Sequence, residues 1–309
     1  MNAVTFLIAY AVVLSWLAPA LLSSPRMSGL HPRLAVAGWL ATVATASIAW
    51  MSALTILVVS AATSVLTSTA VTFCVETLGI TGAVLLPPAL ATMLVVGLLA
   101  LTAGVAVETA RRVIVALSRT RRRNREHAEA VRIIGRPTDH AGVVAVSAEQ
   151  PVAYCVSGGR RSAIVVSTAA LDLLNPAGLA AVLAHERAHL RGYHHHVIAL
   201  LNALAAALPK LPLMRTAAQA VPPLLEMCAD DAASRTHGRA PLVASLVALS
   251  TRRPVPEGAL AAAGTAVVDR VVRLTQSANR SSRPQEMAMS VVVLATLAVP
   301  AMALAFCAL

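Results

Sequence analysis

Four long runs without a charged residue constrain the fold of this chain more than any other feature of its sequence. A helix needs about 20 apolar residues to cross the hydrocarbon core of a bilayer. The runs span residues 3–22, 34–60, 83–107 and 287–308. The first run could be a signal peptide, but it lacks a basic start and a second run soon follows, so we interpret it as a retained helix. The sequence predicts an integral membrane protein with four transmembrane helices.

The composition agrees with a membrane protein and argues against a nucleic-acid-binding one. Only 13% of the residues are charged and 57% are hydrophobic, whereas soluble domains carry roughly a quarter charged residues. The net charge is +11. Positive charge is most concentrated in a group of arginines that follows the third apolar run, namely Arg119, Arg121, Arg122, Arg123 and Arg125. This placement favours contact with anionic lipid headgroups. With 3% aromatic residues, no direct binding of nucleic acid is expected.

The arginines in the loops predict the orientation of the chain in the membrane. Arg26 and Arg33 lie in the first loop, whereas the second loop, at about 61–81, carries Glu76 and no Lys or Arg. The third loop begins with the basic segment from Arg111 onward. Since cytoplasmic loops are enriched in Lys and Arg, the loops alternate inside, outside, inside. Both termini are then outside, and the protein sits in the cell membrane as a multi-pass protein.

Three parts of the chain follow from this topology: membrane helices at 1–110, a cytoplasmic domain at 111–286, and a last membrane helix at 287–309. Within the cytoplasmic domain, residues 143–146, 153–156 and 163–167 are short β-branched segments that predict a small sheet or hairpin. Asn175-Pro176 is typical of an N-cap followed by proline in the first helical turn. Residues 224–235, 241–250 and 269–276 are predicted as further helices. The fold class is therefore mainly α, with an α+β domain.

The segment His185-Glu186-Arg187-Ala188-His189 carries the clearest chemical signal. Histidines four positions apart lie on one face of a helix, so both imidazoles can bind one Zn²⁺ ion. Glu186 can then act as the general base for a water molecule that attacks a carbonyl group. The alternative is a polar stripe without metal. We expect one Zn²⁺ per chain at this motif.

Two residues compete for the place of third zinc ligand. Glu226 lies four positions before Asp230, so that in a helix Glu226 could bind the metal while Asp230 orients a ligand histidine. His195 fits the spacing H-E-x-x-H-x-x-G-x-x-H, but it could reach the ion only if the chain breaks at Gly192. We favour Glu226, because the residues after Gly192 are apolar and helix-forming. His194, His195 and His196 are otherwise interpreted as a solvated or membrane-proximal patch, and the four isolated cysteines as reduced, mostly buried thiols.

The order of these features resembles the membrane metallopeptidases of the BlaR/MecR antirepressor type, and more distantly the HtpX and CAAX-prenyl-protease group. The resemblance covers about residues 143–235, where His185, Glu186 and His189 match the zinc-binding helix of the family. It implies a zincin-like fold in which Glu226 is a zinc ligand and Asp230 supports it. Residues 269–274 are similar to a later segment, which implies that Arg270 helps to stabilise the transition state.

The resemblance implies a zinc endopeptidase that cleaves a cytoplasmic or membrane-proximal protein, possibly a DNA-binding repressor of the BlaI type. In this reading the segment 153–156 offers a strand edge with which an extended substrate could pair. Two alternatives stay open: a quality-control protease of the HtpX type acting on membrane proteins, and a non-catalytic membrane receptor or scaffold. An intact Glu186 argues against the second, because a purely structural metal site does not need a base.

Overall fold

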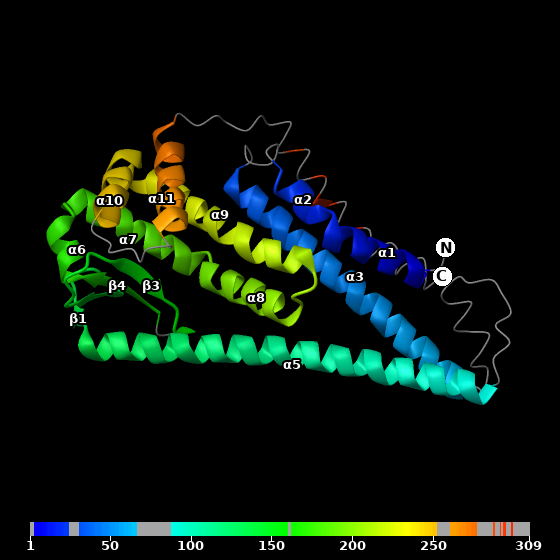
Figure 1. Cartoon of the computed structure of the whole chain (residues 1–309). Helices are drawn as coiled ribbons and strands as arrows, with labels where there is room; N and C mark the ends of the chain where they lie inside the picture. The colour runs from blue at the N-terminus through cyan, green and yellow to red at the C-terminus, as the bar shows by residue number, and fades with distance from the viewer. Residues whose placement is uncertain are drawn as a thin grey trace. The chain divides into compact units, whose positions relative to one another are not determined.

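The computed structural model describes residues 3–24, 31–66, 88–159, 162–251 and 260–276, with a few isolated positions after 286. Figure 1 labels the elements in chain order. The helices are α1 (Ala3–Trp16), α2 (Ala18–Leu22), α3 (Pro32–Leu66), α5 (Pro88–Ile134), α6 (Thr168–Leu173), α7 (Pro176–Arg191), α8 (His194–Ala207), α9 (Pro212–His237), α10 (Arg239–Thr251) and α11 (Leu260–Thr275). The strands are β1 (Arg136–Pro137), β2 (Val143–Val146), β3 (Ala153–Val156) and β4 (Ala163–Ser167). The expected mainly helical fold with a small sheet is confirmed.

The chain forms two compact units. The first comprises residues 1–114, 201–218 and 282–309, and the second comprises residues 115–200 and 219–281. Every strand belongs to the second unit, as do all of α7 and α10.

In the first unit, α1 packs along α3 through small side chains. Leu7 and Ala11 of α1 are fully buried against Ala49 and Ala53 of α3. Small residues let helix backbones approach closely, which is how helices associate in a bilayer. The buried hydroxyl of Ser15 is satisfied, because it accepts a hydrogen bond of 3.1 Å from the indole N–H of Trp50.

The apolar runs correspond in part to these helices. The run at 3–22 forms α1 and α2, which are separated at Leu17, because Pro19 has no N–H to continue the helical hydrogen bonds. The run at 34–60 lies inside α3. Within the described residues, the Pro32–Ser60 part of α3 is the one helix that is long and apolar enough to span a membrane. Several predicted segments lie outside the described residues. They are most of the fourth run, the start of the third run, most of the loop at 61–81, and the linker at 277–285.

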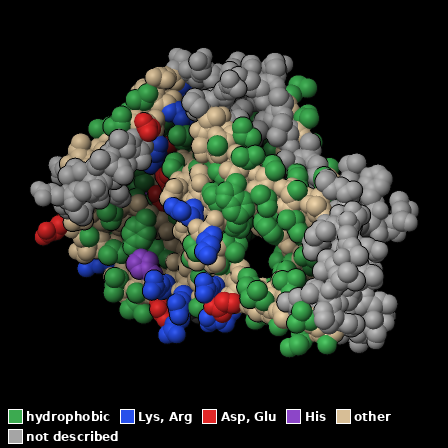
Figure 2. Space-filling view, turned by 45° about the vertical axis from the view of Figure 1, so that its right-hand side comes forward, with side chains coloured by type: hydrophobic (Ala, Val, Ile, Leu, Met, Phe, Trp, Pro, Cys, Tyr) green, Lys and Arg blue, Asp and Glu red, His purple; other side chains and the backbone are tan. Residues whose placement is uncertain are grey.

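Helix α5 continues without a break from the third apolar run into the arginine-rich segment. Its first half exposes large apolar side chains, including Met93 at 72%, Leu101 at 64% and Val107 at 68%. Figure 2 shows hydrophobic side chains over much of the visible surface. Further along the helix, Glu108 forms ion pairs with Arg111 and Arg112. An exposed apolar stretch followed by charge is typical of a helix that leaves a membrane.

The sheet of the second unit has the strand order β1-β2-β4-β3. Strand β4 lies between β2, to which it is parallel, and β3, to which it is antiparallel. The three predicted strands are observed with the predicted bounds, whereas the two-residue strand β1 was not predicted. Within the part of the chain that the structure describes, strand β3 pairs with β4 on one side and with no strand on the other, so it forms an edge of the sheet.

Helices cover both faces of this sheet, and β4 is buried throughout (Figure 1). Ile164 and Val166 pack with Leu183 of α7 on one face. Val165 packs with Ala128 and Val131 of α5 on the other face. Because side chains alternate along a strand, a strand buried on both faces is apolar at every position. The sheet therefore fixes α7, which carries the histidine motif.

Helices α9, α10 and α11 pack against the other side of α7. Ala181 of α7, Ala233 of α9, Leu242 of α10 and Leu274 of α11 form one buried cluster. The predicted helices at 224–235, 241–250 and 269–276 lie in α9, α10 and α11, but α9 and α11 begin earlier than expected. This cluster packs α9, α10 and α11 against α7.

Candidate metal centre

Helix α7 presents His185 and His189 on one face, four positions apart. The helix begins as predicted, because the side chain of the N-cap Asn175 accepts a hydrogen bond of 2.8 Å from the backbone N–H of Gly178. The two imidazole Nε2 atoms lie 3.1 Å apart. His185 is 7% exposed, so its ring is held by the protein rather than by solvent.

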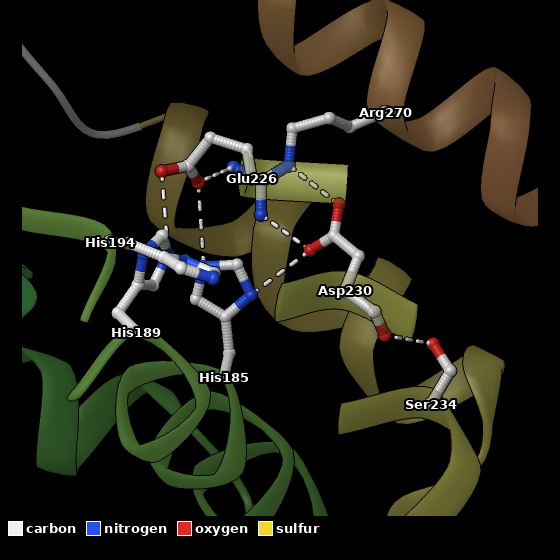
Figure 3. Close-up of polar contacts among 7 residues, drawn as sticks. All are labelled: His185, His189, His194, Glu226, Asp230, Ser234 and Arg270. Atoms are coloured by element: carbon white, nitrogen blue, oxygen red, sulfur yellow. Dashed lines mark hydrogen bonds and ion pairs between the residues drawn. The ribbon is translucent and has the colours of Figure 1, made fainter. Parts of the chain in front are cut away.

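Helix α9 supplies two carboxylates that face these imidazoles (Figure 3). The Oε2 atom of Glu226 lies 3.4 Å from His185 Nε2, and its Oε1 atom lies 3.3 Å from His189 Nε2. Asp230 is fully buried, and its Oδ1 atom lies 3.0 Å from His185 Nδ1. Glu226 thus faces the Nε2 atoms of both histidines, whereas Asp230 faces the Nδ1 atom of His185.

Arg270 of α11 ties the two carboxylates together. Its Nε donates a hydrogen bond of 2.8 Å to Asp230 Oδ2, and its Nη2 donates one of 2.6 Å to Asp230 Oδ1. Its Nη1 lies 3.1 Å from Glu226 Oε2. A bidentate arginine compensates the charge of a buried carboxylate and fixes its orientation. Through these three contacts, Arg270 holds Asp230 and Glu226 in place.

The charges of the centre are strongly coupled. Burial would lower the pKa of His185, but hydrogen bonds to Asp230 and Glu226 raise it to about 9. Burial would raise the pKa of Glu226, yet hydrogen bonds from His185 and His189 hold it well below its usual range. Burial raises the pKa of Glu186. The Glu226 carboxylate therefore stabilises positive charge on the two imidazoles that face it.

The donor set fits Zn²⁺. Two imidazoles and one carboxylate offer ligand atoms that all lie within 4.8 Å of one another. Tetrahedral ligands at about 2.0–2.1 Å from an ion are about 3.3 Å apart, and the observed separations between the facing atoms are 3.1, 3.4 and 3.3 Å. Three protein ligands leave a fourth position for water or substrate, which is the pattern of catalytic zinc sites. His195 is not a member of this group.

A cavity of about 270 Å³ lies beside the centre. Glu186 lines it together with Ala153 and Tyr154 of the edge strand β3. Apolar side chains complete its wall, namely Val182 of α7 and Leu242, Leu246 and Leu249 of α10. An extended chain that pairs with β3 would thus lie directly beside Glu186. The segment 153–156, predicted as a substrate-binding edge, contributes Ala153 and Tyr154 to the lining of this cavity.

Cys155 of β3 lies close to Glu186. Burial first, and then the neighbouring Glu186, raise the pKa of the Cys155 thiol to about 12. The group therefore stays a neutral thiol at physiological pH. Cys228 is buried, and Cys74 and Cys307 lie outside the described residues.

His194 is the residue of this centre that the sequence did not reveal. It was interpreted as part of a solvated patch, but it is only 8% exposed, and its Nδ1 lies 2.9 Å from His189 Nδ1. Burial and the neighbouring His189 lower its pKa to about 4, so the ring is neutral. The chain does break at Gly192, yet the break brings His194 to His189 rather than His195 to the metal centre. Helical periodicity holds only within α7, which ends at Arg191, so spacing along the chain could not show this contact.

The centre thus groups two histidines and a glutamate that could hold a metal ion, beside a cavity that Glu186 lines. The sequence profile of peptidase family M48 matches residues 117–249 of this chain, which include the strands, α7 and Glu226. No curated protein and no solved structure matches the chain. The match covers less than half of the chain and supports a zinc metallopeptidase family. Nothing in it singles out the antirepressor type.

The buried pair of Asp230 and Arg270 gives a prediction for stability. Arg270→Ala should lower the free energy of unfolding of the metal-free protein by about 3–5 kcal/mol, because it leaves the Asp230 carboxylate buried with its main partner removed. The measurement is denaturant unfolding of the full-length protein in detergent, followed by circular dichroism.

Arg273→Ala is the matched control. Arg273 lies on the same helix and pairs with Asp231 at 2.9 Å, but both side chains are partly exposed, at 30% and 19%. This substitution should cost about 1 kcal/mol or less. Equal losses for the two variants would contradict a special role of the Asp230–Arg270 pair.

Proposed function

We propose that this chain is a membrane-bound zinc endopeptidase that cleaves a cytoplasmic or membrane-proximal protein. The observation that supports the proposal best is the approach of His185, His189 and Glu226 to one point, beside Glu186 and the cavity. The profile match to a metallopeptidase family supports it independently.

In this proposal His185, His189 and Glu226 hold one Zn²⁺ ion. When bound, the ion supplies Lewis-acid chemistry: it polarises a carbonyl oxygen and lowers the pKa of water. Glu186 takes a proton from the attacking water and passes it to the leaving amine. Its raised pKa suits both tasks, since a group that titrates closer to neutral pH can accept a proton and give it up again.

The remaining residues position the reacting groups. Asp230 orients the His185 ring through Nδ1, and Arg270 fixes Asp230. Arg270 also lines the cavity, and its described contacts engage three of its five N–H groups. The remaining donors can face a substrate oxygen, so we also propose that Arg270 stabilises the transition state. The strand edge of β3 aligns the substrate backbone.

The proposed substrate is a DNA-bound repressor of the BlaI type, which rests on the resemblance to the antirepressor metallopeptidases alone. The experiment that tests the function is cleavage of such a repressor, and of a quenched fluorescent peptide library, by the purified full-length chain and by Glu186→Gln. The library separates peptidase activity from the choice of substrate. A chain that cleaves the library but not the repressor is a peptidase with another target.

We further propose that four membrane helices hold the protein in the cell membrane, with residues 111–286 in the cytoplasm and both termini outside. The spanning helix at Pro32–Ser60 and the exposed apolar half of α5 support this arrangement. A fluorescent protein inserted after Arg125 should fluoresce, and alkaline phosphatase inserted at the same place should be inactive. Active phosphatase would contradict the orientation.

A further inference from the structure

We propose that His194 is a positioning residue for the zinc site: its Nδ1 accepts a hydrogen bond from His189 and fixes the tautomer and direction of that ring. The inference rests on the proposed function and adds to it a residue that neither the motif nor the profile match assigns. Figure 3 shows the His194 ring beside that of His189.

The contact uses Nδ1 of His189, the ring nitrogen that does not face His185 and Glu226. His189 Nε2 faces His185 and Glu226, so its Nδ1 is free to form another bond. That Nδ1 lies 2.9 Å from His194 Nδ1. If the lone pair of His189 Nε2 faces the ion, the ring hydrogen is on Nδ1 and is donated to the lone pair of His194 Nδ1. The hydrogen of His194 is then on its Nε2.

The backbone between the two helices is built to place this ring. Gly192 ends α7, and a Cβ atom at this position would lie 2.4 Å from His194 Nε2 and 2.6 Å from its Cδ2. Only glycine leaves the space that the ring occupies. Tyr193 has φ = 53°, a left-handed conformation that a residue with a Cβ rarely adopts. The chain therefore reverses over two residues, and His194, the first residue of α8, lies against the last turn of α7.

The two histidine ligands are thus oriented by different chemistry. His185 faces the Asp230 carboxylate, which Arg270 fixes in turn. His189 faces the buried imidazole of His194. Such partners of ligand histidines fix the tautomer and ring direction, and their loss typically costs about 10–100-fold in metal affinity or activity.

The test measures the zinc dissociation constant of the full-length protein in detergent, by competition with a fluorescent zinc chelator. His194→Leu replaces the ring with an apolar side chain of similar width and so removes the acceptor. It should raise the dissociation constant about 10–100-fold. His194→Asn places its Oδ1 near the position of the imidazole Nδ1, and should stay within about threefold of the wild type because it keeps the acceptor. His196→Leu, an exposed neighbour on the same helix, should bind zinc like the wild type.

A second readout separates positioning from folding. With Co²⁺ in place of zinc, the visible spectrum of His194→Leu should differ from that of the wild type, whereas the spectrum of His194→Asn should match it. If His194→Leu does not fold, Gly192→Ala takes its place: it keeps His194 but pushes its ring aside, and should weaken zinc binding by a similar factor.

The outcomes are distinguishable from a failure of the proposed function. A wild-type chain without zinc affinity contradicts the zinc site itself. A wild type that binds zinc, together with His194→Leu of unchanged affinity and spectrum, overturns only the role of His194. Equal losses in His194→Leu and His194→Asn also overturn it, because the acceptor would then not be what matters.

Discussion

Glu186→Gln is expected to slow peptide cleavage by about 10²–10⁴-fold while zinc stays bound. The substitution keeps the size of the side chain and its place on α7, but an amide cannot take a proton from water. Glu186 lines the cavity and is not among the three grouped donors, so the metal site should be unaffected. The measurements are the initial rate on a quenched fluorescent peptide and the zinc content of the same sample.

Glu149→Gln is the matched control for this variant. Glu149 is an exposed glutamate outside the cavity lining, so its loss should leave the rate unchanged. A Glu186→Gln protein that cleaves at the wild-type rate would show that Glu186 is not the base. Loss of both zinc and activity would instead show that Glu186 takes part in holding the metal.

Glu226→Ala is expected to lose zinc, whereas His195→Ala should retain it. Glu226 Oε1 and Oε2 face the two histidine ligands, so its removal leaves two imidazoles for an ion that takes three protein ligands in catalytic sites. We expect zinc affinity to fall by more than the ~10–100-fold that follows from losing a supporting residue. The measurement is zinc bound per chain after dialysis against a weak chelator.

His195 provides an instructive comparison because it matched a zinc-ligand spacing in the sequence. Its ring lies against that of His196, with centroids 4.1 Å apart, and it is not one of the three grouped donors. Retention of zinc by Glu226→Ala and its loss in His195→Ala would reverse the proposed ligand assignment.

The sequence predicted those parts of the fold whose signals are local. The strands at 143–146, 153–156 and 163–167 are short β-branched segments, and the start of α7 is marked by Asn175-Pro176. The facing of His185 and His189 follows from helical periodicity alone. In each case the pattern and the structure that it predicts lie within one element.

Features that depend on contacts between distant elements could not be predicted in this way. Strand β1 consists of Arg136 and Pro137, which carry no strand pattern and pair because β2 lies beside them. A helix was predicted at 224–235, but α9 begins at Pro212 and runs through Pro222 and Pro223. The contact of His194 with His189 depends on the left-handed turn at Tyr193, which no spacing rule describes.

The central claim is that the imidazoles of His185 and His189 and the carboxylate of Glu226 hold one zinc ion. Elemental analysis of the full-length protein, purified in detergent without added metal or chelator, measures this most directly. The account predicts one zinc per chain. A chain that keeps its fold, yet contains no metal and takes up none from a zinc-containing buffer, would contradict it.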